Sequence, residues 1–444
     1  RKESSAASDV YKRQGQWSDV ESIKTPKMFD CVFNHLSSEN EFFQKALSGD
    51  KKSQDMFHFI SKDEYETQKF QENIPLIVRP RISPLFTPYK VKDETKYVWT
   101  TFSADQVDTN ISNPDMLKYL LESFFLYIDK GAKFFRVDAI PFMWKELGTN
   151  CSHLEKTHKF VQLLRAITDE VKTDLHIITE SNVPHTENIT YWGNGTNEAH
   201  LIYNFSLAPL VLHALHFQTN EYLNKWGSQV FDIHESTSFL NFTATHDGIG
   251  LRGLEGIVPE TDVKSLCDKA ESLGGYIAKK RSRDGTEKPY ELNITWASIM
   301  EDSNLSIEHY ITKLVNSQAI VMFMPGITAH YAHNFLGTKN WTEGYEESGI
   351  PRRLNRKKLN YPIDYTDISI RVKNGLLDLI KEKNSHECFS AGAKIEFFEL
   401  SKNVLSFRRS IRDEVATIYY NLTSLELSLE KMSLNPFELR IEYS

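Results

Sequence analysis

The amino-acid sequence predicts a parallel α/β fold of the (β/α)₈ TIM-barrel class, with inserted subdomains and a small C-terminal β domain. Strand-like and helix-like patterns alternate through the middle of the chain, which is typical of parallel α/β proteins. The strand-like runs end in polar or charged residues, at the place where such barrels carry their active sites. After about residue 385 the pattern changes to short alternating strands, which predicts a separate β domain.

Six runs are predicted to be barrel strands, whereas a closed barrel needs eight. The two others are expected before Gly15, so the sequence predicts a barrel whose first two strands are missing, with exposed sheet edges and poor folding. An open six-stranded sheet is the alternative. The six predicted strands are Lys27–His35, Phe134–Ala139, His176–Ser181, Leu201–Phe205, Leu240–His246 and Ile320–Met324.

Changes of pattern along the chain predict the domain boundaries. Residues 1–14 contain few apolar residues and no periodicity, so we expect a non-native leader. Residues 37–100 are polar and rich in proline, which predicts an irregular inserted domain B after the third strand. The other predicted parts are the catalytic barrel (15–36 and 101–385), a second inserted subdomain (252–305) and the C-terminal β domain (386–444).

Two helices are predicted on either side of the central region. Met116–Asp129 places its apolar residues on one face and is followed by Gly131 as a stop signal. A second helix is predicted around Ile368–Lys383. The residues expected on the inward face of the first helix are Leu117, Leu120, Leu121, Phe124, Phe125 and Ile128.

Composition excludes several classes of function. The net charge of −8 argues against nucleic acid as a partner, because binding to phosphate backbones needs a basic surface. No apolar run approaches the length of a membrane span. The scattered cysteines indicate reduced thiols in a cytoplasmic protein and make a structural metal improbable. These cysteines are Cys31, Cys151, Cys267 and Cys388.

The strand ends hold the candidate catalytic residues. Arg136 and Asp138 are two apart on one strand, so their side chains leave the same face, and the guanidinium would keep the carboxylate ionised as a nucleophile. Glu180 ends the next strand and is the candidate proton donor. Retaining glycoside chemistry needs two carboxyl groups roughly 5–5.5 Å apart, which neighbouring strands at about 4.8 Å spacing allow.

A third carboxylate follows a later strand. Asp247 is a candidate for binding sugar hydroxyls and opposing the positive charge of the transition state, with His35 and His246 as further hydroxyl ligands. Taken singly, such residues more often cap loops, form surface ion pairs or lie in the core. Their occurrence in order along successive strands favours a functional site.

Four of these segments resemble, in order, the four motif regions of the α-amylase family of glycoside hydrolases. The resemblance implies that Asp138 is the nucleophile, Glu180 the acid/base and Asp247 the transition-state stabiliser. It also implies donor-glucose binding at the matching arginine and histidines, and Asp30 is a further substrate-binding candidate. The segments are DCVFNH (30–35), FRVDAI (135–140), IITES (177–181) and TATHD (243–247), and the donor-glucose candidates are Arg136, His35 and His246.

Within that family the chain is similar to the sucrose phosphorylase subfamily, through RPRISPLFTPY (79–89) and PRRLNRKKL (351–359) among other segments. TESNVPHTENITYWG (179–193) is more similar to its glucosylglycerate and glucosylglycerol phosphorylase branch. Ser181-Asn182 stands where a sucrose phosphorylase would have Val-His. The resemblance therefore implies a retaining α-glucoside phosphorylase that converts 2-O-α-glucosylglycerate and phosphate to α-glucose 1-phosphate and glycerate through a glucosyl-enzyme intermediate.

A phosphorylase must favour phosphate over water, so its acceptor side needs fixed positive charge and hydrogen-bond donors. The candidates are Arg81, His185, Arg356 and Tyr331. The expected partners are a small glucoside and inorganic phosphate as co-substrate, with no other cofactor and no metal. The alternatives are a sucrose or glucosylglycerol phosphorylase, a hydrolase or transglucosidase, and a non-catalytic barrel used for binding.

Overall fold

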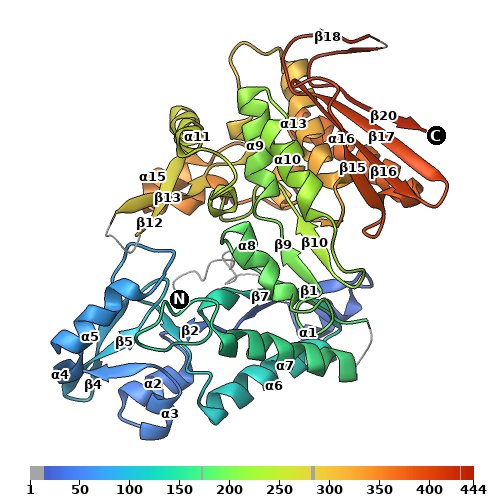
Figure 1. The fold of residues 1–444 in the computed structure, drawn as a ribbon. Coiled ribbons are helices and arrows are strands. Elements are labelled where there is room, and N and C mark those ends of the chain that lie inside the picture. Colours follow the sequence, from blue (N-terminus) through green and yellow to red (C-terminus); the bar gives the residue numbers. More distant parts are fainter. Residues whose placement is uncertain (1–14, 172–173, 282–285, 431) are drawn as a thin grey trace. The chain divides into compact units, whose positions relative to one another are not determined.

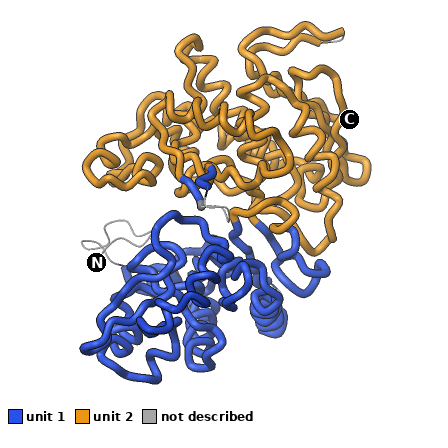
Figure 2. Tube along the Cα trace, turned by 60° about the vertical axis from the view of Figure 1, so that its left-hand side comes forward, with its two compact units in different colours: residues 1–181, 189–202, 279–288 blue, residues 182–188, 203–278, 289–444 orange. Residues whose placement is uncertain are grey.

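The chain divides into two compact units, which Figure 2 distinguishes by colour. The computed structural model describes residues 15–171, 174–281, 286–430 and 432–444 (Figure 1), so the predicted leader lies outside the described residues. Each unit has its own apolar core. Unit 1 comprises residues 1–181, 189–202 and 279–288, and unit 2 comprises residues 182–188, 203–278 and 289–444.

Unit 1 contains parallel strands in the order β1-β7-β8-β9. Hydrogen bonding between β1 and β7 places Asp30 opposite Arg136 and Val32 opposite Asp138. Because parallel strands end at the same edge, this register brings the polar strand ends together. The first four predicted strands are therefore confirmed, with somewhat different ends. They are β1 (Lys27–Val32), β7 (Ala132–Asp138), β8 (His176–Thr179) and β9 (Leu201–Tyr203), of which Tyr203 belongs to unit 2.

Helix α6 (Pro114–Asp129) confirms the predicted helix 116–129. Its first turn is capped by Asn113, whose side chain accepts hydrogen bonds from two backbone amides, and Gly131 follows the helix with a φ of 80°. The buried stripe is narrower than expected, because only residues four apart face the core. Phe125 is consequently exposed, and its predicted inward orientation was wrong. The buried residues are Met116, Leu120, Phe124 and Ile128.

The stretch 37–100 is more regular than its proline content predicted. It contains four short helices and a three-stranded antiparallel sheet in the order β3-β5-β4, packed around a small core that includes Phe70, Phe86 and Trp99. The prediction of irregular structure here was wrong, because the short elements are bounded by the turn residues that obscured their periodicity. The elements are α2 (Glu41–Leu47), α3 (Lys51–Asp55), α4 (Lys62–Tyr65), α5 (Gln68–Asn73), β3 (Phe59–Ser61), β4 (Phe86–Val91) and β5 (Glu94–Trp99).

Two further parts complete unit 1. Strands β2 (His35–Ser37) and β6 (Gln106–Asp108) pair antiparallel and flank the stretch just described, with His35 opposite Asp108. Helices α1 (Trp17–Ser22) and α7 (Glu155–Val171) belong to the same unit.

Unit 2 contains the parallel pair β10 (Ser238–Asn241) and β14 (Ile327–Thr328). The strand predicted at Ile320–Met324 was wrong, because residues 320–323 form the last turn of helix α13 (Ile307–Phe323), and the strand follows it. A continuous apolar run does not distinguish a buried strand from a helix that is buried on most of its surface. The other long helices are α9 (Leu207–Phe217), α10 (Glu221–Val230), α11 (Glu260–Ser272) and α16 (Asp367–Ser385), the last of which confirms the helix predicted around 368–383.

Unit 2 also contains several smaller elements. A three-stranded sheet has the order β11-β13-β12, in which Ile249 pairs antiparallel with Leu292. Its strands are β11 (Ile249–Gly250), β12 (Tyr276–Arg281) and β13 (Glu287–Asn293), of which residues 279–281 and 287–288 belong to unit 1. The short helices are α8 (His185–Asn188), α12 (Trp296–Ile299), α14 (Ala332–Phe335) and α15 (Thr342–Ser348).

The C-terminal strands form an antiparallel sheet in the order β15-β16-β17-β20, which confirms the predicted β structure of the tail. Buried residues of this sheet, among them Phe407 and Ile418, share one apolar core with helices α9 and α13. The β domain is therefore anchored within unit 2. Its strands are β15 (Lys394–Phe397), β16 (Val404–Ile411), β17 (Glu414–Asn421) and β20 (Leu439–Tyr443), beside the small hairpin β18 (Leu427–Ser428) and β19 (Ser433–Leu434).

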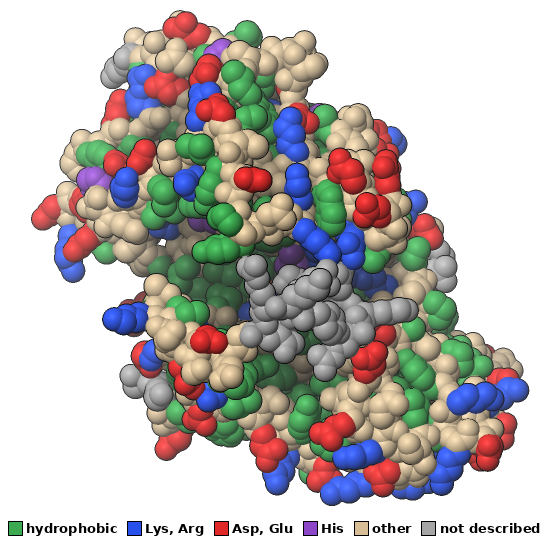
Figure 3. Space-filling view, turned by 180° about the vertical axis from the view of Figure 1, so that it is seen from behind, with side chains coloured by type: hydrophobic (Ala, Val, Ile, Leu, Met, Phe, Trp, Pro, Cys, Tyr) green, Lys and Arg blue, Asp and Glu red, His purple; other side chains and the backbone are tan. Residues whose placement is uncertain are grey.

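Over the described surface in Figure 3, basic and acidic side chains are interspersed rather than gathered into one broad basic field. Within the described residues, every helix is too short or too polar to traverse a lipid bilayer. All four cysteines are buried and free. The predicted domain boundaries stay predictions.

Candidate active site

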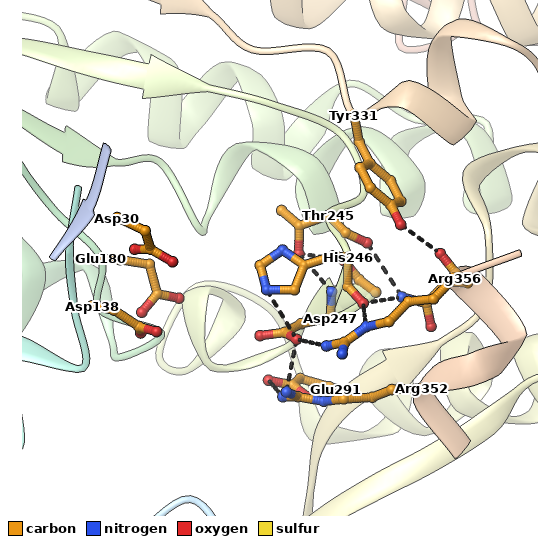
Figure 4. Close-up of polar contacts among 12 residues, drawn as sticks. Asp30, Asp138, Glu180, Thr245, His246, Asp247, Glu291, Tyr331, Arg352 and Arg356 are labelled. Atoms are coloured by element: carbon orange, nitrogen blue, oxygen red, sulfur yellow. Dashed lines mark hydrogen bonds and ion pairs between the residues drawn. The ribbon is translucent and has the colours of Figure 1, made fainter. Parts of the chain in front are cut away.

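Four charged side chains gather at the ends of β1, β7 and β8 in unit 1. The Arg136 guanidinium lies 2.7 Å from a carboxylate oxygen of Asp30, 3.5 Å from Asp138 and 3.9 Å from Glu180. Arg136 is 9% exposed, so its charge is largely shielded from solvent. Three carboxyl groups therefore contact one buried guanidinium, and Figure 4 shows the three carboxyl groups side by side.

The backbone fixes the two central carboxyl groups. Strand β7 ends at Asp138, and the next residue, Ala139, has a φ of 57°, a left-handed conformation that costs energy in a residue other than glycine. The turn that follows directs the chain away from the sheet at this point. The backbone amide of Glu180 donates to the carbonyl of Val137 at 3.1 Å, so parallel pairing continues to the residue that carries the carboxyl group.

His35 lies beside this cluster in the same unit. Its Nε2 is 2.7 Å from the Gln106 side chain, and its ring lies 5.2 Å from that of Phe102. Burial lowers the pKa of His35, although Asp108 and Asp138 oppose this effect, so the imidazole is neutral near pH 7. A neutral imidazole can both donate and accept a hydrogen bond, which suits recognition of a sugar hydroxyl.

A buried ion pair holds the residue next to His35 in the chain. The Lys145 ammonium lies 2.8 Å from the Asp108 carboxylate and donates to the Asn34 side chain at 2.7 Å. Asp108 also accepts hydrogen bonds from the backbone amide and the hydroxyl of Thr101. The network holds Asn34, the neighbour of His35, in a fixed position. Sequence analysis missed this network, because nothing in the sequence pairs residues 37 positions apart.

Arg81, the first acceptor-side candidate, lies in the same unit. Its guanidinium carbon is 5.8 Å from the centre of the Phe102 ring, which also contacts His35. One Nη donates to the carbonyl of Pro80 at 2.9 Å. Phe102 therefore links Arg81 to the histidine, and sequence analysis did not identify this phenylalanine.

In unit 2, a tight turn after β10 presents Asp247. Thr245 and Gly248 exchange backbone hydrogen bonds at 2.9 and 3.0 Å, and the Asp247 amide donates to the Thr245 hydroxyl. Gly248 has a φ of 100°, and a Cβ at this position would lie 2.1 Å from the carbonyl oxygen of Leu292. Only glycine fits there, so the turn depends on Gly248.

Two arginines contact the Asp247 carboxylate (Figure 4). Arg352 and Arg356 each lie 2.7 Å from the same oxygen, Oδ1, and Nε2 of His246 lies 3.4 Å from it. Arg352 also forms an ion pair with the buried Glu291 at 2.9 Å. Of these residues, sequence analysis missed Arg352 and Glu291. The basic run at 351–359 was the available signal, but it did not distinguish which cation faces the site.

The remaining candidates in unit 2 have different surroundings. The Tyr331 hydroxyl donates to the carbonyl of Asn355 at 2.9 Å, and burial raises the pKa of Tyr331 to about 12, so the phenol stays protonated. The His185 ring lies 5.8 Å from that of Trp226 and 6.3 Å from that of Phe239, and burial lowers its pKa. His185 is thus a neutral ring in an aromatic environment, and its phosphate-binding role stays a prediction.

The structure therefore groups the predicted residues into two clusters. Within unit 1 it brings together Asp30, Arg136, Asp138 and Glu180, with His35 and Arg81 linked through Phe102. Within unit 2 it brings together His246, Asp247 and Arg356. Tyr331 donates a hydrogen bond to Asn355, the residue before Arg356. Within the described ranges, three or more His, Cys, Asp or Glu side chains nowhere form a group suited to a metal ion.

Parallel strands ending in clustered carboxyl groups, followed by a C-terminal β domain, define a barrel of the glycoside hydrolase type. The chain belongs to the α-amylase family, since the model of the α-amylase catalytic domain matches residues 21–247. A solved structure, sucrose 6F-phosphate phosphorylase from Thermoanaerobacter thermosaccharolyticum, matches with a TM-score of 0.80 at 22% identity. The match covers 97% of this chain and 84% of that one, and it confirms the predicted barrel fold with its C-terminal β domain.

Two curated relatives with similar sequences are named glucosylglycerate phosphorylases. The glucosylglycerate phosphorylase of Escherichia coli (strain K12) is 37% identical over 413 residues, which cover 91% of this chain and 72% of that protein. The glucosylglycerate phosphorylase of Spirochaeta thermophila is also 37% identical, over 90% of this chain and 68% of that protein. The predicted family membership is thus confirmed, and both of these relatives are named as phosphorylases.

Proposed function

We propose that this protein is a retaining α-glucoside phosphorylase that converts 2-O-α-glucosylglycerate and phosphate to α-glucose 1-phosphate and glycerate. The observation that carries the proposal is the contact of three strand-end carboxyl groups with the single guanidinium of Arg136. Relatives at 37% identity that are named glucosylglycerate phosphorylases support the choice of aglycone. The proposal includes inorganic phosphate as co-substrate and no further cofactor.

In the first step, Asp138 attacks the anomeric carbon and Glu180 protonates the leaving oxygen of the aglycone. The Arg136 charge keeps the Asp138 carboxyl group ionised and therefore nucleophilic. Asp247 and the two histidines, His35 and His246, bind the hydroxyl groups of the sugar. The negative charge of Asp247 opposes the positive charge that develops on the sugar in the transition state.

In the second step, phosphate replaces the aglycone and displaces Asp138 from the anomeric carbon. Glu180 now accepts the proton of the phosphate, which reverses its role in the first step. Two displacements at the same carbon give net retention, so the product is the α anomer of glucose 1-phosphate. The free thiols of the four cysteines support a cytoplasmic location, where phosphate is available and disulfides are rare.

The proposal is tested by product analysis with glucosylglycerate, glucosylglycerol and sucrose, each with and without phosphate. We expect glucose 1-phosphate to form fastest from glucosylglycerate, and only when phosphate is present. Free glucose at an equal rate without phosphate would instead identify a hydrolase. Preference for sucrose or glucosylglycerol would retain the reaction type and correct the aglycone.

A further inference from the structure

Two arginines converge on one oxygen atom in unit 2. Arg352 is the second residue of the short 3-10 helix η6 (Pro351–Asn355) and Arg356 follows its last residue, and each guanidinium lies 2.7 Å from Oδ1 of Asp247. Both side chains are partly exposed, at 22% and 23%, so a solute can reach them. Paired guanidiniums on a single oxyanion position are the geometry that proteins use to bind phosphate and carboxylate groups.

Arg352 is held in place by a second carboxylate. Its Nη2 donates to both oxygens of Glu291, at 2.9 and 3.3 Å, and Glu291 is only 5% exposed. Although burial lowers the pKa of Arg352, Asp247 and Glu291 together raise it above its usual value, so the guanidinium is always charged. The ion pair with Glu291 uses one Nη of Arg352. The other Nη contacts Asp247 and points to the position of Oδ1.

Arg356 has an anchor of a different kind. Its Nε donates to the carbonyl of His246 at 2.8 Å, and the Tyr331 hydroxyl donates to the carbonyl of the preceding residue, Asn355. Each arginine is thus fixed by a group other than the Asp247 side chain. If the Asp247 carboxylate rotated away, both guanidiniums would keep their positions, and the position of Oδ1 would become available to another oxyanion.

We infer that Arg352, together with Arg356, binds an oxyanion of the substrate at the position that Asp247 Oδ1 occupies in this structure. The ligand is a phosphate oxygen in phosphorolysis and a carboxylate oxygen of the aglycone in the reverse reaction, since both present the same acceptor to a guanidinium. Binding of the oxyanion requires the Asp247 carboxylate to rotate away from this position. The inference rests on the proposed function, which supplies these two anions.

Binding of inorganic phosphate to the whole chain tests the inference without turnover. In isothermal titration calorimetry, Arg352→Gln is expected to raise the Kd for phosphate by about tenfold to a hundredfold, the effect of one charged hydrogen bond. Arg353→Gln is the matched control on the same turn, where the guanidinium carbon lies 5.8 Å from the Trp341 ring centre. The control should leave the Kd within about twofold. Equal effects of the two variants, or none from Arg352→Gln, would overturn the inference.

Kinetics separate anion binding from a purely positioning role. With α-glucosyl fluoride as a neutral donor, Arg352→Gln should raise the KM for phosphate by a larger factor than it lowers kcat for transfer to glycerol, a neutral acceptor. If Arg352 only positions Asp247, phosphate and glycerol transfer will lose kcat equally, which contradicts the inference. The KM for glycerate in the reverse reaction shows whether the aglycone carboxylate uses the same position, and a rise for either anion supports the assignment.

Further results distinguish failure of the inference from misfolding of the variant and from failure of the proposed function. Arg352→Lys retains the charge and should recover part of the phosphate affinity, whereas a misfolded variant would show no cooperative unfolding transition. If the wild-type chain binds phosphate through Arg352 but forms no glucose 1-phosphate, the proposed function fails and the binding site stands. If it forms glucose 1-phosphate with unchanged KM in Arg352→Gln, the function stands and the site fails.

Discussion

The two clusters of charged residues differ in their balance of carboxyl and guanidinium groups. In unit 1, Asp30, Asp138 and Glu180 contact the single guanidinium of Arg136. In unit 2, the contacts join two carboxylates, Asp247 and Glu291, to two arginines. Carboxyl groups that outnumber cations compete for charge, which favours one of them carrying a proton, whereas a balanced group of ion pairs has no such tendency.

This difference suggests a division of labour between the clusters. A carboxyl-rich group suits nucleophilic attack and proton transfer, since its members must hold different protonation states. A group with as many arginines as carboxylates suits binding of anions, because its donors cannot lose their protons. Substitutions in the first cluster should therefore reduce the rate of bond breaking, and those in the second should separate anion binding from that rate.

The largest effect is expected from Asp138→Asn. Without a nucleophile the glucosyl-enzyme intermediate cannot form, so kcat for phosphorolysis should fall by about 10⁴-fold or more. The measurement is single-turnover release of glycerate from glucosylglycerate, with circular dichroism to confirm the fold. Retention of more than about a tenth of the wild-type rate would remove Asp138 from the nucleophile role.

Glu180→Gln should have a smaller effect that depends on the leaving group. Loss of the proton donor is expected to slow cleavage of glucosylglycerate by about 10²–10⁴-fold, while α-glucosyl fluoride, whose leaving group needs little protonation, should react far faster than glucosylglycerate. Rates for the two donors with the same variant measure the difference. An equal loss for both donors would mean that Glu180 does not act as the acid.

Sequence analysis predicted the first cluster better than the second. The proximity of Arg136 and Asp138 follows from the two-residue period of a strand, and that of Glu180 follows from parallel pairing of neighbouring strands. Both rules depend only on positions within one strand or in two neighbouring strands. The Arg352–Glu291 pair joins residues 61 apart in the sequence, from a turn and a strand. Nothing in a local pattern specifies such a pair, because it depends on how distant elements pack.

The error at Ile320–Met324 has a related cause. Helix α13 packs on most of its surface, so its end contains consecutive apolar residues without the stripe that marks an exposed helix. The Phe125 error is the reverse, since apolar residues on an exposed face widened the apparent stripe of α6. In both cases the surroundings of the element, rather than its own sequence, decided which residues are buried.

Asp247→Asn tests whether the second cluster separates binding from catalysis. Loss of the carboxylate should lower kcat by about 10²–10³-fold, because transition-state charge is no longer stabilised. The same variant should bind inorganic phosphate more tightly than the wild type, since no internal anion competes for Arg352 and Arg356. Calorimetry and initial rates on one preparation provide both values. Weaker phosphate binding in this variant would show that Asp247 organises the arginines instead of occupying their ligand position.

The smallest effect on activity is expected from His200, which lies at the opposite end of β8 from the carboxyl cluster. This histidine contacts neither cluster but makes the stability of the sheet depend on pH. Its Nδ1 accepts a hydrogen bond from the backbone amide of Ile177 at 3.0 Å, which requires a neutral ring, and burial lowers the pKa of His200 to about 4. The unfolded chain, with a histidine pKa near 6.5, takes up the proton first. The contribution of His200 to stability is therefore complete above about pH 6.5 and is lost as the pH falls through about 4.

Urea unfolding at several pH values tests this contribution against His200→Asn, which keeps an acceptor at the position but does not titrate. Between about pH 6.5 and 4 the free energy of unfolding of the wild type should fall more steeply than that of the variant, by at most about 1.4 kcal/mol per pH unit. The kcat of the variant near pH 7 should be unchanged, because residues at the amino ends of barrel strands serve stability rather than chemistry. Parallel pH dependences of the two proteins would show that folding does not lower the pKa of His200. A loss of kcat in the variant would instead mean that the carboxyl cluster at the other end of the sheet responds to this histidine.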